Sequence, residues 1–168
     1  MQRRSLKRSC WRNPLILKAG QAIDRVGGML GLPFPAGAEL DRLAQQSKRR
    51  FAVKPSMKGA NCCLSGIQNQ CQKMLHAGEC REDIARFCIE SVLAAIDAMA
   101  EELLRQDGTY PFLFAGGVMS NRVIRDAIIQ KYDASFAEPS FSCDNAAGIA
   151  VLAAAQEKNL PREQQAGI

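Results

Sequence analysis

The sequence predicts an α/β fold in which short strands alternate with helices beside a more helical portion. Residues 82–106 carry apolar side chains at helical spacing. After them, an apolar run at 109–116, an amphipathic segment at 121–131 and a second apolar run at 134–139 follow in order. An alternation of strand and helix favours a parallel sheet. The composition agrees, because 168 residues with 47% hydrophobic and 23% charged side chains suit one soluble globular domain.

The first predicted helix covers residues 17–30, and Gly31 followed by Pro33 indicates its end. Its apolar residues recur at helical spacing: Leu17, Ala19, Ala22, Ile23, Val26 and Leu30. The two prolines at 33 and 35 predict a tight loop with Gly37, and a second short helix is expected to start with Leu40, Leu43 and Ala44. Residues 50–66 alternate loosely and have Gly59 between their halves, which predicts a hairpin at a sheet edge.

The longest predicted helix, over residues 82–106, belongs to the core because its apolar residues share one face. These residues are Ile84, Phe87, Cys88, Val92, Ile96, Met99 and Leu103. Strands are expected at 109–116 and 134–139, with a helix at 121–131 between them. A last helix over 142–157 would take Asp144 as its N-cap. The domain is therefore expected to cover residues 17–158, between a disordered basic arm at 1–16 and a frayed tail at 159–168.

The basic arm accounts for the net charge of +5, because five basic residues and no acid lie among the first twelve. Such an arm can contact a nucleic-acid backbone, but such arms are more often only solvated, or the product of a displaced start codon. The sequence has no apolar run of eighteen residues and no signal-peptide block, so we expect a cytoplasmic protein without a membrane span. The seven cysteines form no CxxC pair, which favours packing over zinc ligation.

One candidate ligand site lies in the loop after the strand at 109–116. Ligands of open α/β sheets bind at the carboxyl ends of strands. Gly116 and Gly117 allow backbone to approach a flat or charged group, and amides at the following helix start favour an anion. Asn121 can offer a donor and an acceptor to a ribose hydroxyl or a base edge. The alternative is that the glycines only make a turn and Asn121 only caps a helix.

Three further positions could bind a ligand. Asp144 could present its carboxylate to a divalent metal, or it could only cap its own helix. Asp24 lies on a partly apolar face of the first helix, where the alternative is a solvated surface acid. Gly37 could serve a ligand or only make the turn.

Four motifs, in order and spacing, resemble the C-terminal half of the TsaD/Gcp family: AGQAIDRVGGMLGLPFPAG, LSGIQNQ, AGGVMSNRVIR and CDNAAGIAVLAA. These are the tRNA threonylcarbamoyladenosine synthase subunits, once called O-sialoglycoprotein endopeptidases. Their fold is that of the actin-like/Hsp70-like (ASKHA) ATPases. The resemblance covers about residues 17–156. It implies that the chain corresponds to the C-terminal half of an ASKHA fold.

The resemblance also implies a substrate and a site. The family moves a threonylcarbamoyl group from threonylcarbamoyl-AMP, an adenine nucleotide, to N6 of adenosine 37 in tRNA. By resemblance, Asp24, Gly37 and Asn121 hold the nucleotide part. Gly116 and Gly117 form the wall beside it. No catalytic residue of this chain is implied, and tRNA and the other subunits of the transfer complex are the implied partners.

Asp144 matches the aspartate of the family's divalent metal site, of iron or zinc type. The family's other ligands come from an HxxxH motif in its N-terminal half, whereas this sequence has one histidine, His76. The family's PGG is present as Pro35, Ala36 and Gly37, and its FSFSGLKTA as CCLSGIQNQ. These departures favour a divergent or truncated paralogue, which we expect to be inactive alone. The alternative is a non-enzymatic interaction module that pairs with a full-length homologue or a partner subunit.

Overall fold

The computed structural model describes residues 15–58, 61–108 and 111–138. The predicted final helix with Asp144, the tail and most of the basic arm lie outside the described residues. The helices are α1 (Leu15–Met29), α2 (Gly37–Gln46), α3 (Ser65–His76), α4 (Arg81–Asp107) and α5 (Arg122–Lys131). The strands are β1 (Ser56–Lys58), β2 (Asn61–Cys63), β3 (Phe112–Phe114) and β4 (Ala134–Phe136), and a 3-10 helix, η1, covers Gly117–Ser120.

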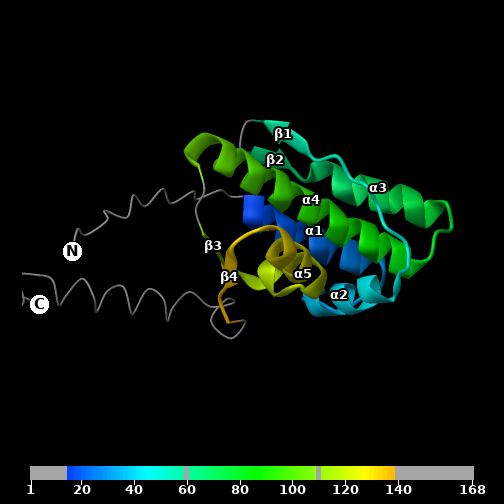
Figure 1. Cartoon of the computed structure of the whole chain (residues 1–168). Helices are drawn as coiled ribbons and strands as arrows, with labels where there is room; N and C mark the ends of the chain where they lie inside the picture. Colours follow the sequence, from blue (N-terminus) through cyan, green and yellow to red (C-terminus); the bar gives the residue numbers. More distant parts are fainter. Residues whose placement is uncertain (1–14, 59–60, 109–110, 139–168) are drawn as a thin grey trace, which may run out of the picture.

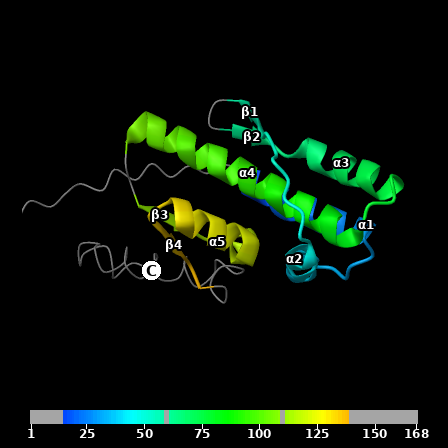
Figure 2. The ribbon, with the colours of Figure 1, turned by 45° about the vertical axis from the view of Figure 1, so that its right-hand side comes forward.

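Helix α4, 27 residues long, is the element against which the others pack (Figure 1). Helices α1, α2, α3 and α5 all contact it, with α3 running beside it (Figure 2). The predicted core face is confirmed, because Ile84, Cys88 and Val92 are buried on it. The remaining residues of that face are half-buried at its edge. Burial of this apolar stripe is the main force that assembles the helices.

Helix α1 ends as its glycine predicted. Gly31 has a φ of +71°, a conformation that suits a residue without a side chain. The N–H of Leu32 donates to the carbonyl of Gly27 at 2.9 Å, and the N–H of Gly31 donates to Gly28 at 3.0 Å. This pair of bonds is the Schellman arrangement that satisfies the last carbonyls of a helix. The helix begins at Leu15, two residues before the predicted start.

The two predicted strand pairs are present but short. Strands β1 and β2 pair antiparallel, with Ser56 opposite Cys63, as the predicted hairpin requires. Strands β3 and β4 pair in parallel, with Phe112 opposite Ala134, and α5 makes the connection between them. This strand–helix–strand unit confirms the predicted parallel pairing. The described part is thus a mixture of α and β structure in which helices predominate.

Helix α3 was missed by the sequence reasoning, which treated residues up to 66 as the end of the hairpin. Its signal is three buried residues at helical spacing: Ile67, Cys71 and Met74. Polar glutamines and an asparagine between them weaken the apolar pattern, and no side chain caps the helix start. Among the described residues, Cys62, Cys71, Cys80 and Cys88 are free thiols. No helix in the described part of the chain is long and apolar enough to cross a bilayer.

Candidate functional site

Asp24 joins α1 to the loop that precedes α2. Its side chain is half-buried, and its Oδ1 atom accepts a hydrogen bond from the backbone N–H of Ala36 at 2.9 Å. Asp24 is therefore not simply a solvated surface acid. The bond holds the start of α2 over α1. Gly37, the first residue of α2, directly follows the donor residue, so the structure brings Asp24 and Gly37 together.

The approach of this loop to α1 depends on Gly27. A Cβ atom added to Gly27 would lie 2.1 Å from the Cβ of Ala36, which is far inside van der Waals contact. Ala36 is itself 1% exposed. The loop can therefore lie on α1 only because Gly27 has no side chain. Sequence reasoning gave Gly27 no role, and the adjacent glycines at 27 and 28 were its only local signal.

Asp41, one helical turn after Gly37, is a second residue that sequence reasoning missed. Its Oδ2 atom accepts a hydrogen bond from the backbone N–H of Arg122 at 3.2 Å. Its Oδ1 atom is buried and has no hydrogen-bond partner in the part of the chain that the structure describes. Buried carboxylate oxygens are nearly always hydrogen-bonded, so this atom is an exception that a donor from outside the described residues would explain. In the sequence, the only sign of its role is that Asp41 lies four residues after Gly37, which places the two residues on the same face of α2.

Asn121 begins α5 at the same place. It is 7% exposed, and its side-chain oxygen accepts a hydrogen bond from the backbone N–H of Ile124 at 3.1 Å. Capping of α5 therefore accounts for the side-chain oxygen of Asn121. An asparagine amide also carries two N–H donors, which are the part of the side chain that could serve a ligand. The carboxylate of Asp41 bonds the backbone of Arg122, so it lies one residue along the chain from Asn121.

The 3-10 helix η1 lies between Gly116 and Asn121, so the loop does not lead directly into α5. Gly116 has a φ of +110°, which strongly favours glycine. The N–H of Met119 donates to the carbonyl of Gly116 at 3.0 Å, and the N–H of Asn121 donates to Val118 at 3.2 Å. Gly117 is exposed at the start of this turn. The start of α5 was expected to favour an anion. The carboxylate of Asp41 partly satisfies this preference, because it already accepts a hydrogen bond from the N–H of Arg122, the first residue of α5.

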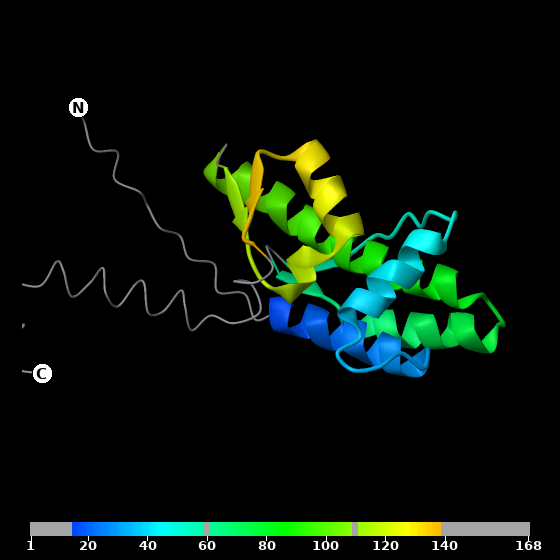
Figure 3. The ribbon, with the colours of Figure 1, turned by 90° about the horizontal axis from the view of Figure 1, so that it is seen from below.

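These contacts connect three predicted positions, Asp24, Gly37 and Asn121, through Asp41. Asp24 holds the loop at Gly37, α2 leads from Gly37 to Asp41, and Asp41 bonds the residue after Asn121. Seen from below, α1, α2 and the start of α5 meet at one side of α4 (Figure 3). Two carboxylates and one amide are suited to hydroxyl and N–H donors, such as those of a nucleoside, more than to a phosphate.

Helix α2 is also fixed at its far end. The hydroxyl of Ser47 donates to Oδ1 of Asp83 on α4 at 2.5 Å. This hydrogen bond lowers the pKa of the Asp83 carboxyl, with a smaller contribution from the nearby guanidinium of Arg49. Arg49 also pairs with Glu79 at 2.6 Å. The helix that carries Gly37 and Asp41 is therefore tied to α1 at its start and to α4 at its end.

A metal site cannot be assembled from the described residues. They contain no group of three or more His, Cys, Asp or Glu side chains placed to hold a metal ion. Asp144 lies outside the described residues. His76 is the last residue of α3 and shortly precedes the start of α4. The described residues thus do not by themselves make a complete iron or zinc centre.

Comparisons with known proteins place the whole region in one family. The family model described as tRNA N6-adenosine threonylcarbamoyltransferase, TsaD, matches residues 14–151. A protein of that name from Chlorobium luteolum is 32% identical, over 80% of this chain and 45% of its own length. The Thermus thermophilus protein of the same name is 27% identical, over 80% of this chain and 43% of its own length.

A further relative is named a probable bifunctional tRNA threonylcarbamoyladenosine biosynthesis protein, from Thermoplasma acidophilum. It is 33% identical, over 65% of this chain and 21% of its own length. The chain therefore spans between about a fifth and less than half of the length of these curated relatives.

Proposed function

This chain belongs to the TsaD family of tRNA N6-adenosine threonylcarbamoyltransferases, and we propose that it supplies the nucleoside-binding part of a threonylcarbamoyl transfer site. The observation that carries this proposal is the buried Oδ1 atom of Asp41, which has no hydrogen-bond partner among the described residues and whose carboxylate bonds Arg122, next to Asn121. Leaving a buried acceptor unpaired costs about 1–3 kcal/mol. A ligand hydroxyl that donates to this oxygen would recover that energy. The ribose of threonylcarbamoyl-AMP carries such hydroxyl groups.

Each residue of the site has a proposed part in holding the adenylate. Asp41 accepts a ribose hydroxyl, and the amide N–H groups of Asn121 donate to a ribose oxygen or to the base. Gly37 lets the backbone approach the sugar, and Gly116 and Gly117 form the wall at the other side. Asp24 keeps the loop at Gly37 in place through its bond to Ala36.

The proposed contribution of this chain to the reaction is positioning. In the transfer, N6 of adenosine 37 attacks the carbamoyl carbonyl, the new C–N bond forms, the C–O bond to the phosphate breaks so that AMP leaves, and N6 gives up one proton to solvent. Holding the adenylate in a fixed pose lowers the entropic part of that barrier. Asp144 would be one ligand of the divalent metal of iron or zinc type. Further polypeptide would supply the other metal ligands and the contacts with the tRNA. We therefore expect the 168-residue chain alone to show no transfer to tRNA, and we place it in the cytoplasm with the family's other subunits as partners.

Calorimetric titration of the chain with AMP tests this proposal. We expect saturable binding that Asp41→Ala and Asn121→Ala weaken by about tenfold, since each removes about one hydrogen bond to a polar ligand. Asp126→Ala is the matched control, because Asp126 is an exposed acid on α5, away from its first turn. Equal affinities in all four proteins would contradict the proposal.

The second candidate function is a non-enzymatic interaction module, and the apolar groove described below favours it. Nucleotide binding separates the two functions. A parent chain that binds no AMP, yet binds a polypeptide of the family, would support the module. Transfer activity of the purified chain without any other protein would contradict both.

A further inference from the structure

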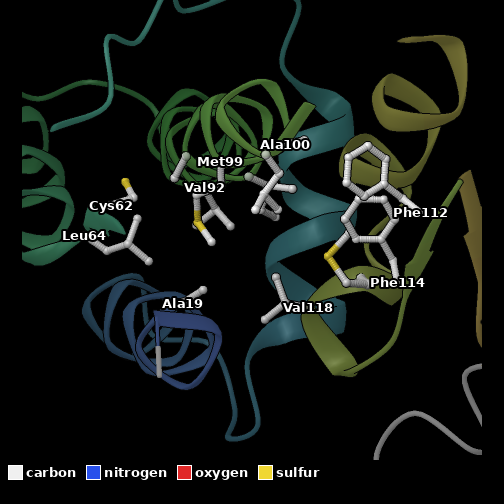
Figure 4. A pocket seen from close by; sticks show the side chains of 13 residues that line it. Ala19, Cys62, Leu64, Val92, Met99, Ala100, Phe112, Phe114 and Val118 are labelled. Carbon is white, nitrogen blue, oxygen red and sulfur yellow. The ribbon is translucent and has the colours of Figure 1, made fainter. Parts of the chain in front are cut away.

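A partly open apolar groove of about 120 Å³ lies between α1, α4, β2 and β3 (Figure 4). Phe112 and Phe114 point into it from β3, and Met99 and Leu103 line it from α4. Ala19 of α1 and Leu64, which follows β2, line the opposite side. No charged side chain is among the described residues that line it. None of the nucleotide-site residues lines this groove, so it is a separate feature of the molecule.

Among the described residues, the strand beside the groove, β3, has one edge without a partner strand. On the side of β4, the N–H of Phe112 donates to Asp133 and the carbonyl of Phe114 accepts from Ala137, each at 2.8 Å. Backbone groups of successive residues in a strand point to opposite sides, so the N–H and C=O of Leu113 point away from β4. Among the described residues, β3 and β4 form a sheet of only two strands. The side chain of Leu113 is 76% exposed.

A two-stranded parallel sheet of this kind is incomplete. Parallel sheets are normally covered on both faces, and two strands alone are marginally stable. An unpaired edge is a template for a further strand, whose main-chain hydrogen bonds supply affinity. The neighbouring groove then selects the side chains of that strand. Because its walls carry no charge, it suits apolar side chains at alternate positions.

We propose that the β3 edge and the groove together bind an extended apolar strand from the part of the longer family members that this chain does not match. An extended occupant is required because Leu113 presents one donor and one acceptor along a strand edge. Such a segment is available in the family, since more than half of the length of the Chlorobium luteolum relative lies outside the match. The surface requires none of Asp24, Asp41 or Asn121, so it goes beyond the proposed nucleotide site.

Binding of a defined polypeptide tests this surface. The probe is the unmatched part of the Chlorobium luteolum relative, made as one recombinant polypeptide and titrated into the 168-residue chain. We expect a one-to-one complex and slower hydrogen exchange at the Leu113 amide. AMP binding is measured separately, so failure of either proposal is visible without the other.

Two variants test the mode of binding. Leu113→Pro removes the edge donor, and proline is tolerated on strand edges, whereas Leu113→Ser keeps the donor and changes only the exposed side chain. We expect about tenfold weaker binding for the proline variant and little change for the serine variant.

Leu103→Glu places a charge in the groove and should weaken binding by about tenfold or more. Its control is Ile129→Glu, which adds the same charge at a 49% exposed position of α5 outside the groove. If Leu113→Pro does not fold, exchange at the Leu113 amide in the parent chain decides the question.

Three results would overturn the proposal. One is the absence of a complex, or a complex that Leu113→Pro and Leu103→Glu leave unchanged. Another is self-association of the chain through this edge, which would make a second copy the occupant. The third is a Leu113 amide that is already protected in the monomeric chain and loses protection when residues 139–168 are deleted. That result would assign the edge to the chain's own C-terminal segment.

Discussion

Replacement of Gly27 by alanine tests the packing that places the nucleotide site. The new Cβ atom would meet the Cβ of Ala36 at 2.1 Å, whereas ordinary contacts lie at 3.4–4 Å, so the loop must move by more than an ångström. The atom it meets is close to the backbone, and it cannot rotate away. Overpacking of this kind costs about 1–3 kcal/mol. The shift would also break the hydrogen bond between Ala36 and Asp24.

Gly28→Ala is a matched control on the same helix. A Cβ atom added there meets nothing within 4 Å, and the residue is exposed. Alanine favours helix over glycine by up to about 1 kcal/mol, and both variants share that gain. The free energies of unfolding of the two variants should therefore differ by the overpacking cost of about 1–3 kcal/mol.

The assay is thermal unfolding of the two variants, followed by AMP titration of each. In a domain of this size, about 1 kcal/mol corresponds to about 2–4 °C in Tm. We expect Gly28→Ala to melt higher than the parent chain and Gly27→Ala to melt lower than Gly28→Ala. Only Gly27→Ala should weaken AMP binding. Equal melting temperatures for the two variants would refute the close approach of Ala36 to α1.

Other variants make independent predictions. Asn121→Ala removes the cap of α5 and should lower the free energy of unfolding by about 1 kcal/mol in chemical denaturation; an unchanged value would mean that the cap contributes nothing. Asp41→Ala also removes a buried oxygen without a partner, so it should cost less stability than Asn121→Ala; a larger loss would show that Asp41 is satisfied in the free chain. The lowered pKa of Asp83 means that its contribution is complete above the ordinary carboxyl pKa and is lost as the pH falls below about 4. Asp83→Asn should therefore lower Tm at pH 7 and flatten its fall on acidification, and parallel pH profiles of Tm would contradict this. Cys88 is fully buried and its thiol pKa is raised by a hydrogen bond with Cys71 and by burial, so alkylation at Cys88 should follow global unfolding; rapid modification under native conditions would disagree.

Much of the fold could be predicted because its helices carry strong periodic patterns. The stripe from Ile84 to Val92 and the glycine stop at Gly31 are local signals, and the structure confirms both. The parallel pairing of β3 and β4 followed from the order of the segments. Helix α3 was missed because cysteine and methionine supply much of its buried face and polar residues interrupt the pattern.

The candidate site could be predicted only in part. Asp24, Gly37 and Asn121 stand in recognisable motifs, and the structure places them in one connected region. Asp41 could not be found from local sequence, because its importance lies in a contact with Arg122, 81 residues away. The need for glycine at position 27 likewise arises only when the loop at Ala36 is packed against α1.

The most direct test of the nucleoside site is an NMR titration of the isotopically labelled 168-residue chain with AMP. We expect the largest shifts of backbone amides to cluster at Gly37, Asp41 and Arg122, and Asp41→Ala to reduce them together. Shifts that are absent at saturating AMP, or that cluster around the groove at β3 instead, would contradict it.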